Sequence, residues 1–234
     1  MGTIASLADV VGGFVLVRAR GVERYLHYFV ALGAGFLMAT AVIEMAPESI
    51  RLAPYWGPIL IMAGYCAVHL LEHTINAHFH WGEETHCEEF ISHRTGISVL
   101  TGLSVHALFD GVAIGSGFAV TNRLGWLIFL AILLHKAPEG FTMASVMMAS
   151  GRSRSAAFFS AVTLAAATLA GVLIIGLAPA LLPIGLPVSA GVAFYVAATD
   201  LVPEVNREPG IRMALVFFAG VGGFLLLRYL LPSI

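Results

Sequence analysis

Long apolar runs separated by short polar connections dominate this chain of 234 residues. Most of the runs reach the ~20 residues that a helix needs to cross ~30 Å of hydrocarbon at ~1.5 Å per residue. The runs lie at roughly 3–17, 28–48, 56–75, 97–120, 124–149, 155–181, 185–204 and 211–231. The first run is short for a span, at about 15 residues. The pattern predicts an all-α, polytopic membrane protein with eight transmembrane helices.

Composition supports a membrane protein and excludes one class of partner. The chain is 59% hydrophobic and 11% charged, with a mean hydropathy of +0.89. Its net charge is -2 and its twelve Lys and Arg residues are scattered, so it offers no basic surface to a phosphate backbone. We therefore expect no nucleic-acid partner. Cys66 and Cys87 form neither a metal-binding CxxC pair nor a disulfide framework.

Basic residues between the runs predict the orientation of the chain, because Lys and Arg are retained on the cytoplasmic side. With the N-terminus outside, the inner connections hold Arg18, Arg20, Arg24, Arg94, Arg152, Arg154, Arg207 and Arg212. The outer side then holds only Arg51, Arg123 and Arg228. This asymmetry predicts an integral membrane protein with both termini outside. We expect it to lie in the plasma (inner) membrane.

The longest polar segment, at about 76–95, is cytoplasmic by the same count. Residues 76–94 carry four His, one Cys and four Glu. Such a segment can bind divalent metal loosely, or it can be only a solvated acidic loop. The residues do not decide between these two readings.

The pattern acid-x-x-Pro-Glu occurs near the ends of two predicted helices, at 44–48 in the second run and at 200–204 in the seventh. With the orientation above, these two runs cross the membrane in opposite directions. That is the arrangement of an inverted repeat of helices 1–3 and 6–8 around a hairpin of helices 4 and 5, which is common in transporters. Because the match is short, chance similarity is the alternative.

Two ionisable pairs lie inside apolar runs. The sequence HALFDG begins at His106, and HKAPEG begins at His135. A charged group at mid-bilayer costs on the order of 2.5–3.5 kcal/mol and is rarely left without a partner. Asp110 follows His106 by four positions, as Glu139 follows His135, so each pair projects from one face of its helix.

The short connection at 121–123 makes the fourth and fifth runs an antiparallel hairpin. Counted from it, Asp110 lies level with His135, and His106 lies level with Glu139. Two imidazoles and two carboxylates can thus meet at one point, a donor set that suits Zn²⁺, Fe²⁺ and Mn²⁺. The alternative is two His/carboxylate hydrogen bonds that only fix helix packing, and the matched depth disfavours it.

These features resemble the ZIP (Zrt/Irt-like) family of divalent metal transporters, of prokaryotic type. The resemblance covers the eight runs, the His-rich segment between the third and fourth runs, and the two motifs, of which HKAPEG is the most specific. It implies one transmembrane transporter domain over residues 1–234, with a His-rich cytoplasmic loop at about 76–95. It also implies uptake of Zn²⁺, with Cd²⁺, Fe²⁺ or Mn²⁺ as further substrates, by alternating access in which one helix bundle slides past another.

Carried over by position, the metal ligands are His106, Asp110, His135 and Glu139. Family members often hold a second metal beside the first, but the matching positions here are Ala107 and Lys136. We therefore expect a single metal, with the Lys136 ammonium standing where a second ion would be. Protonation of the His and carboxylate groups weakens metal binding, so transport is expected to depend on pH.

Several other residues have two possible roles each. Met38 is a weak extra ligand or core filler. The acids at helix ends either attract cations to the pathway or lie in headgroup regions; they are Glu44, Glu48, Asp200 and Glu204. A cluster near the end of the third run is an exit site or the rim of the polar loop; it consists of His69, Glu72 and His73.

We expect a transporter and not an enzyme, with no organic cofactor and with the lipid bilayer and divalent ions as partners. The alternative is an intramembrane zinc-dependent hydrolase, which needs three ligands, an open water position and a general base. No HExxH motif is present in the sequence, and coordination can use all four candidate groups. A homodimer is left open.

Overall fold

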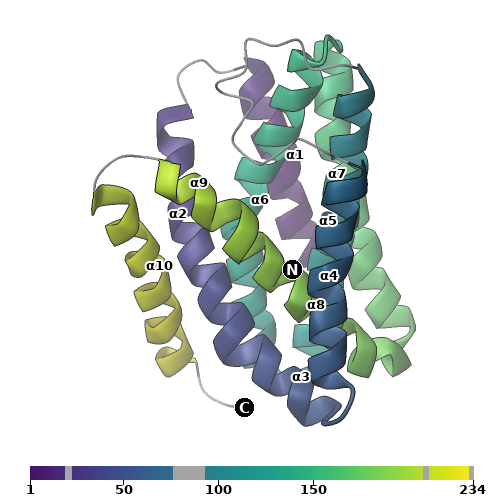
Figure 1. Cartoon of the computed structure of the whole chain (residues 1–234), viewed down its shortest axis with the longest axis vertical. Coiled ribbons are helices and arrows are strands. Elements are labelled where there is room, and N and C mark those ends of the chain that lie inside the picture. The colour runs from purple at the N-terminus through teal and green to yellow at the C-terminus, as the bar shows by residue number, and fades with distance from the viewer. Residues whose placement is uncertain (19–22, 76–92, 208–210, 232–234) are drawn as a thin grey trace.

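The computed structural model describes residues 1–18, 23–75, 93–207 and 211–231, and within these ranges it contains helices and no strand (Figure 1). The all-α prediction is therefore confirmed for the described part of the chain. The elements are α1 (Gly2–Arg18), α2 (Glu23–Thr40), η1 (Ala41–Met45), α3 (Ala46–Leu52), α4 (Gly57–Ile75), α5 (His93–Val120), α6 (Asn122–Ala149), α7 (Arg154–Leu177), η3 (Pro179–Leu181), α8 (Leu182–Tyr195), η4 (Val196–Leu201), α9 (Val202–Arg207) and α10 (Ile211–Leu230).

Six helical segments of the described chain are long and apolar enough to cross a membrane. They are Leu26–Leu52, Gly96–Val120, Asn122–Ala149, Arg154–Leu177, Pro179–Arg207 and Ile211–Leu230. They coincide with the second and the fourth to eighth predicted spans. The apolar part of α1, Gly2–Val15, is shorter than these, and α4 carries Glu72 and two histidines near its end.

The break between the sixth and seventh predicted runs lies earlier than the sequence pattern indicated. We predicted the sixth run to reach residue 181, but α7 ends at Leu177. Ala178, the residue before Pro179, has φ -131° and ψ 69°, because proline disfavours a helical conformation in the residue before it. The helix then restarts at Pro179, whose missing N–H is harmless in a first turn.

Both helices that carry the acid-x-x-Pro-Glu pattern widen into a π-helical turn at the acid. Glu44 lies in η1 and Asp200 lies in η4. Pro47 and Pro203 follow each acid by three residues, and proline removes a hydrogen bond and clashes with the carbonyl four residues earlier. The N–H groups of Ala46 and Val202 accordingly bond the carbonyls five residues back.

The main helices form two groups. α1, α5, α6 and α7 pack against one another, while α2 packs on α10 and α4 packs on α8. The groups meet chiefly where α2 contacts α6 and where α5 contacts α8. Figure 1 shows α10 at the edge of the molecule beside α2, and only 17% of its span is buried, as expected of a helix that faces lipid.

Four helix pairs approach so closely that a Cβ atom would meet the backbone of the neighbouring helix. In each pair, one glycine on each helix lies against a carbonyl of the other, at 1.9–2.2 Å from the position a Cβ would take. The pairs are Gly12 and Gly140 (α1 with α6), Gly111 and Gly171 (α5 with α7), Gly35 and Gly220 (α2 with α10), and Gly64 and Gly191 (α4 with α8). Small residues permit such backbone contact in membrane helices.

Candidate metal site

The candidate site lies in the hairpin of α5 and α6. Each helix has 28 residues, and only Thr121 lies between them. The Thr121 hydroxyl accepts a hydrogen bond from the Leu124 N–H at 3.1 Å, which caps the start of α6. The predicted hairpin is confirmed, and its tight turn fixes the register of the two helices.

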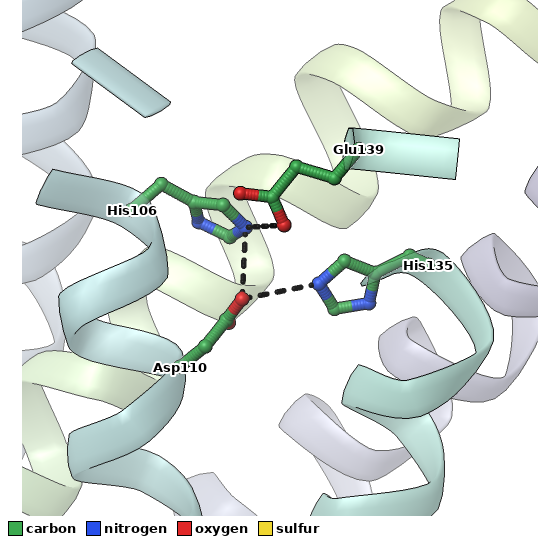
Figure 2. A group of neighbouring side chains, drawn as sticks. All are labelled: His106, Asp110, His135 and Glu139. Atoms are coloured by element: carbon green, nitrogen blue, oxygen red, sulfur yellow. Dashed lines mark hydrogen bonds and ion pairs between the residues drawn. The ribbon is translucent and has the colours of Figure 1, made fainter. Parts of the chain in front are cut away.

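Figure 2 shows the four predicted ligands turned toward one another from the two helices. His106, Asp110, His135 and Glu139 are all buried, and one ligand atom of each lies within 4.8 Å of the other three. The predicted levels agree with the distances, because His135 Nε2 is 3.3 Å from Asp110 Oδ2 and His106 Nε2 is 3.9 Å from Glu139 Oε2. His106 Nε2 also lies 3.2 Å from Asp110 Oδ2.

The backbone orients the His135 ring. Its Nδ1 lies 3.0 Å from the Ala131 carbonyl, one turn earlier in α6. A carbonyl only accepts, so Nδ1 donates the hydrogen in this contact and Nε2 is the nitrogen that faces the cluster. Metal-ligating histidines usually hold their second nitrogen in this way. His135 is therefore oriented so that Nε2 is the atom available to a metal ion.

A buried ammonium adjoins the four residues. Lys136 Nζ lies 2.6 Å from Glu139 Oε2 and 2.9 Å from Asp110 Oδ2, and the side chain has no exposed surface. We predicted a lysine that offsets the charge of these two acids, and the contacts agree with that prediction. Ala107 is completely buried and apolar, so it offers no ligand beside His106.

The sequence analysis missed a third carboxylate. Asp9 of α1 is completely buried and its Oδ2 lies 3.7 Å from Lys136 Nζ. The backbones of α1 and α6 touch here, since a Cβ on Gly140 would be 2.0 Å from the Asp9 carbonyl oxygen. The available signal was an acid inside the first apolar run, which by itself marks a functional candidate.

Comparison with known proteins decides the family. The family model described as "ZIP Zinc transporter" matches residues 82–228, which is more than half of the chain. The chain belongs to the ZIP zinc transporter family. It is 26% identical over 259 residues to Zinc transporter ZIP9 of Xenopus tropicalis, an alignment that covers 87% of this chain and 84% of that protein.

Two further ZIP relatives match parts of the chain. Zinc transporter ZIP9 of Micropogonias undulatus is 30% identical over 160 residues, which is 63% of this chain and 51% of the relative. Zinc transporter SLC39A7 of Homo sapiens is 30% identical over 145 residues, or 55% of this chain and 30% of the relative. These relatives are animal proteins, so the prokaryotic subtype stays a prediction.

Membership of the ZIP family makes this chain an integral membrane transporter of metal and not an enzyme. The predicted family and the predicted transport function are thus confirmed, and zinc is the substrate class that the family supports. The alternative of an intramembrane hydrolase is not favoured. The metal ligands themselves stay a prediction from the sequence and the geometry.

At one end of this ZIP protein, two arginines neutralise the acid of η1. Arg228 Nε lies 2.5 Å from Glu44 Oε1, and Arg123 Nη2 lies 3.5 Å from the same oxygen. Arg228 belongs to the same helix group as Glu44, whereas Arg123 belongs to α6 in the other group. Glu48, one turn further on, pairs with the exposed Arg51.

Asp200 of η4 is buried, and Glu204 pairs with Arg207 at 3.3 Å and with His27 at 3.9 Å. Nearby, the Tyr195 hydroxyl donates a hydrogen bond to Glu72 at 2.8 Å. Neither a pathway role nor a purely structural role for these acids is decided by the contacts.

Of the remaining predicted residues, His69, Glu72 and His73 do not belong to the buried cluster. The rings of His69 and His73 stack with centroids 4.1 Å apart near the exposed end of α4, and both side chains are exposed. Met38 is partly buried and packs against the apolar core, which favours its reading as core filler. The His-rich segment lies mainly outside the described residues, which resume at residue 93.

Proposed function

We propose that this ZIP protein carries Zn²⁺ into the cytoplasm through a mid-membrane site whose ligands are His106, Asp110, His135 and Glu139. The observation that carries this proposal is the convergence of four buried ligand atoms within 4.8 Å of one another. Two imidazoles and two carboxylates are a donor set that suits Zn²⁺. Cd²⁺, Fe²⁺ and Mn²⁺ share enough of this chemistry to be further substrates.

Unsatisfied polar atoms in the cluster support a cation at this place. Nδ1 of His106 and Oε1 of Glu139 are buried, and within the described part of the chain they have no hydrogen-bond partner. A buried polar atom without a partner costs about 1–3 kcal/mol, so such atoms call for an explanation. A metal ion that accepts their lone pairs supplies one. A packing role alone leaves these atoms unexplained.

We further propose that the site holds one metal and not two. A second ion next to the first would need ligands near positions 107 and 136, where the chain has the apolar Ala107 and the cationic Lys136. The ammonium contacts both proposed carboxylate ligands at 2.6 and 2.9 Å. It therefore repels a second cation at the place where these carboxylates could share one.

The proposed architecture has eight transmembrane helices with an inverted repeat of helices 1–3 and 6–8. Three features support this proposal. The acids of η1 and η4 occupy matching π turns. A two-fold relation between the repeats exchanges α1 with α7, α2 with α8, α4 with α10, and α5 with α6. It therefore turns the pair of α2 and α10 into the pair of α8 and α4, and the pair of α1 and α6 into the pair of α7 and α5, and all four pairs are present. The reciprocal glycines recur in all four of these pairs.

The chain is proposed to form one transporter domain over residues 1–234 in the plasma (inner) membrane, surrounded by lipid, with both termini outside. The segment at about 76–95 is then a cytoplasmic, His-rich loop. The excess of arginine in the predicted inner connections supports this orientation. Association into a homodimer stays a prediction.

Transport is proposed to proceed by alternating access. The cluster belongs to the group of α1, α5, α6 and α7, and it faces the second group across the contacts of α6 with α2 and of α5 with α8. Movement of the first group along the second would expose the cluster first to one side of the membrane and then to the other. The metal would travel with its ligands.

Metal flux into liposomes tests the proposed function. We expect the reconstituted chain to take up ⁶⁵Zn²⁺, and we expect His135→Ala to lower uptake by roughly 100-fold or more, because loss of a ligand removes several kcal/mol of binding. His27→Ala is the matched control, since His27 lies on α2 outside the buried cluster. Equal uptake by wild type and His135→Ala contradicts the proposed site. Hydrolysis of a lipid or peptide without any flux contradicts the proposed function.

A further inference from the structure

Asp9 is a buried acid beside the cluster that the proposed coordination does not use. It has no exposed surface, and neither oxygen has a hydrogen-bond partner within the described residues. Its closest charged neighbour is Lys136 Nζ, at 3.7 Å. A carboxylate that is buried without close partners is costly, so its presence in an apolar helix needs a reason.

The ammonium of Lys136 competes with the metal for the same two acids. It lies 2.9 Å from Asp110 and 2.6 Å from Glu139, through oxygens that also face the histidines. Two positive groups that share these oxygens repel each other strongly where water is excluded. A metal ion that binds Asp110 and Glu139 must therefore weaken the contacts of Lys136 with both acids.

We propose that Asp9 receives the Lys136 ammonium when a divalent cation takes Asp110 and Glu139, so that Asp9 is a positioning residue that sets metal affinity. This inference rests on the proposed function, because it assumes that the cation binds the buried cluster. Asp9 does not contact the metal. It acts by accepting the positive charge that the metal displaces.

The geometry permits this exchange without movement of a helix. Nζ must come closer to Asp9 Oδ2 by about 1 Å to pass from 3.7 Å to the length of a charge-assisted hydrogen bond. A change of this size lies within the reach of lysine rotamers. The backbone of Asp9 is held in place, because α1 lies against α6 at Asp9 itself, opposite Gly140, and again at Gly12, about one turn later.

The charges of the enlarged cluster also match a divalent ion. With neutral imidazoles and ionised acids, Asp9, Asp110 and Glu139 exceed Lys136 by two negative charges, which a divalent cation cancels. Without the charge of Asp9, the metal-bound cluster would hold an uncompensated positive charge in a buried place. Such a charge is strongly destabilising.

A double-mutant cycle tests the proposal on the full chain purified in detergent, with ZnCl₂ titrated calorimetrically at fixed pH. We expect Asp9→Asn to weaken zinc binding by roughly tenfold or more, since a buried charge loses its partner. We expect Lys136→Met, added to Asp9→Asn, to restore most of the affinity, because no ammonium then needs an acceptor. Asp9→Glu should retain affinity to within about threefold. Glu48→Gln, which removes a partly buried acid outside the cluster, is the matched control.

Restoration by Lys136→Met separates charge acceptance from a structural role, because a chain misfolded by Asp9→Asn would not regain affinity from a second change. The proposal is overturned if Asp9→Asn binds zinc like the wild type, or if the double variant binds no better than Asp9→Asn. If Asp9→Asn does not yield folded protein, Asp9→Ser takes its place in the cycle, and the same two results overturn the proposal. His135→Ala in the same assay isolates the proposed function, because undiminished binding there would refute the site itself.

Discussion

At the scale of single residues, the close approach of α1 to α6 requires the absence of a side chain at Gly140. This position follows Glu139 in the HKAPEG motif, and its backbone lies against the Asp9 carbonyl. Any Cβ here would push α1 away from α6. The motif glycine is thus required by the approach of the first helix.

We expect Gly140→Ala to lower the free energy of unfolding by about 1–3 kcal/mol or more, because the overlap is with backbone and not with a flexible side chain. The measurement is the thermal unfolding midpoint of the protein purified in detergent. Gly222→Ala is the matched control, since a Cβ on Gly222 has no other atom within 4 Å and alanine is the better helix former. Similar midpoints for both variants would contradict the close contact.

The convergence of the four proposed ligands could be predicted from the sequence because each pair is four residues apart in a helix and both pairs can be counted from one tight turn. Asp9 could not be placed in the same way. Its position beside Lys136 depends on the packing of α1 against α6, and these helices are more than a hundred residues apart in the chain. Local periodicity contains no signal for that contact.

At the scale of helices, the ion pair of Glu44 and Arg123 is a contact between the two groups. It joins η1 to the start of α6, whereas the shorter pair of Glu44 and Arg228 stays within one group. If the groups move past each other during transport, only the first pair has to break.

We therefore expect Arg123→Ala to raise the maximal uptake rate about two- to fivefold without a change in zinc affinity, since partly exposed pairs contribute up to about 1 kcal/mol. Arg228→Ala is the matched control, because it removes a charge from the same acid without crossing between groups. Initial uptake rates in liposomes at saturating zinc measure the effect. Slower uptake by Arg123→Ala, or equal rates for both variants, would count against the movement.

The apolar runs predicted the positions of the long helices well, but they did not predict the irregular turns and the break inside the runs. The π turns at Glu44 and Asp200 and the break at Ala178 all depend on a proline close by. Hydropathy treats these prolines as interruptions of an apolar run and does not say whether the helix widens, breaks or continues. In α6 the helix continues through Pro138.

At the scale of the whole molecule, the orientation in the membrane rests on arginine counts alone. A labelling experiment can test the orientation with one exposed position at each end of the helix bundle. Tyr55, between α3 and α4, is 74% exposed and belongs to the predicted outer side, while Arg154 at the start of α7 is exposed on the predicted inner side.

In a background with Cys66→Ser and Cys87→Ser, we expect an impermeant maleimide to label Tyr55→Cys in intact cells. Arg154→Cys should be labelled only after the membrane is permeabilised, because positive residues are retained in the cytoplasm. The labelled fraction before and after permeabilisation is the measurement. The opposite pattern would reverse the orientation, and with it the direction assigned to uptake.

The single-residue connection at Thr121 has a consequence for how an ion crosses. With no slack between α5 and α6, neither helix can shift along the other by even one turn without breaking the cap at Leu124. Histidines and acids on the two helices therefore keep a fixed mutual spacing in this hairpin. If they are the ligands of the transported ion, that ion keeps one set of ligand atoms while the helices around the hairpin change their contacts with it.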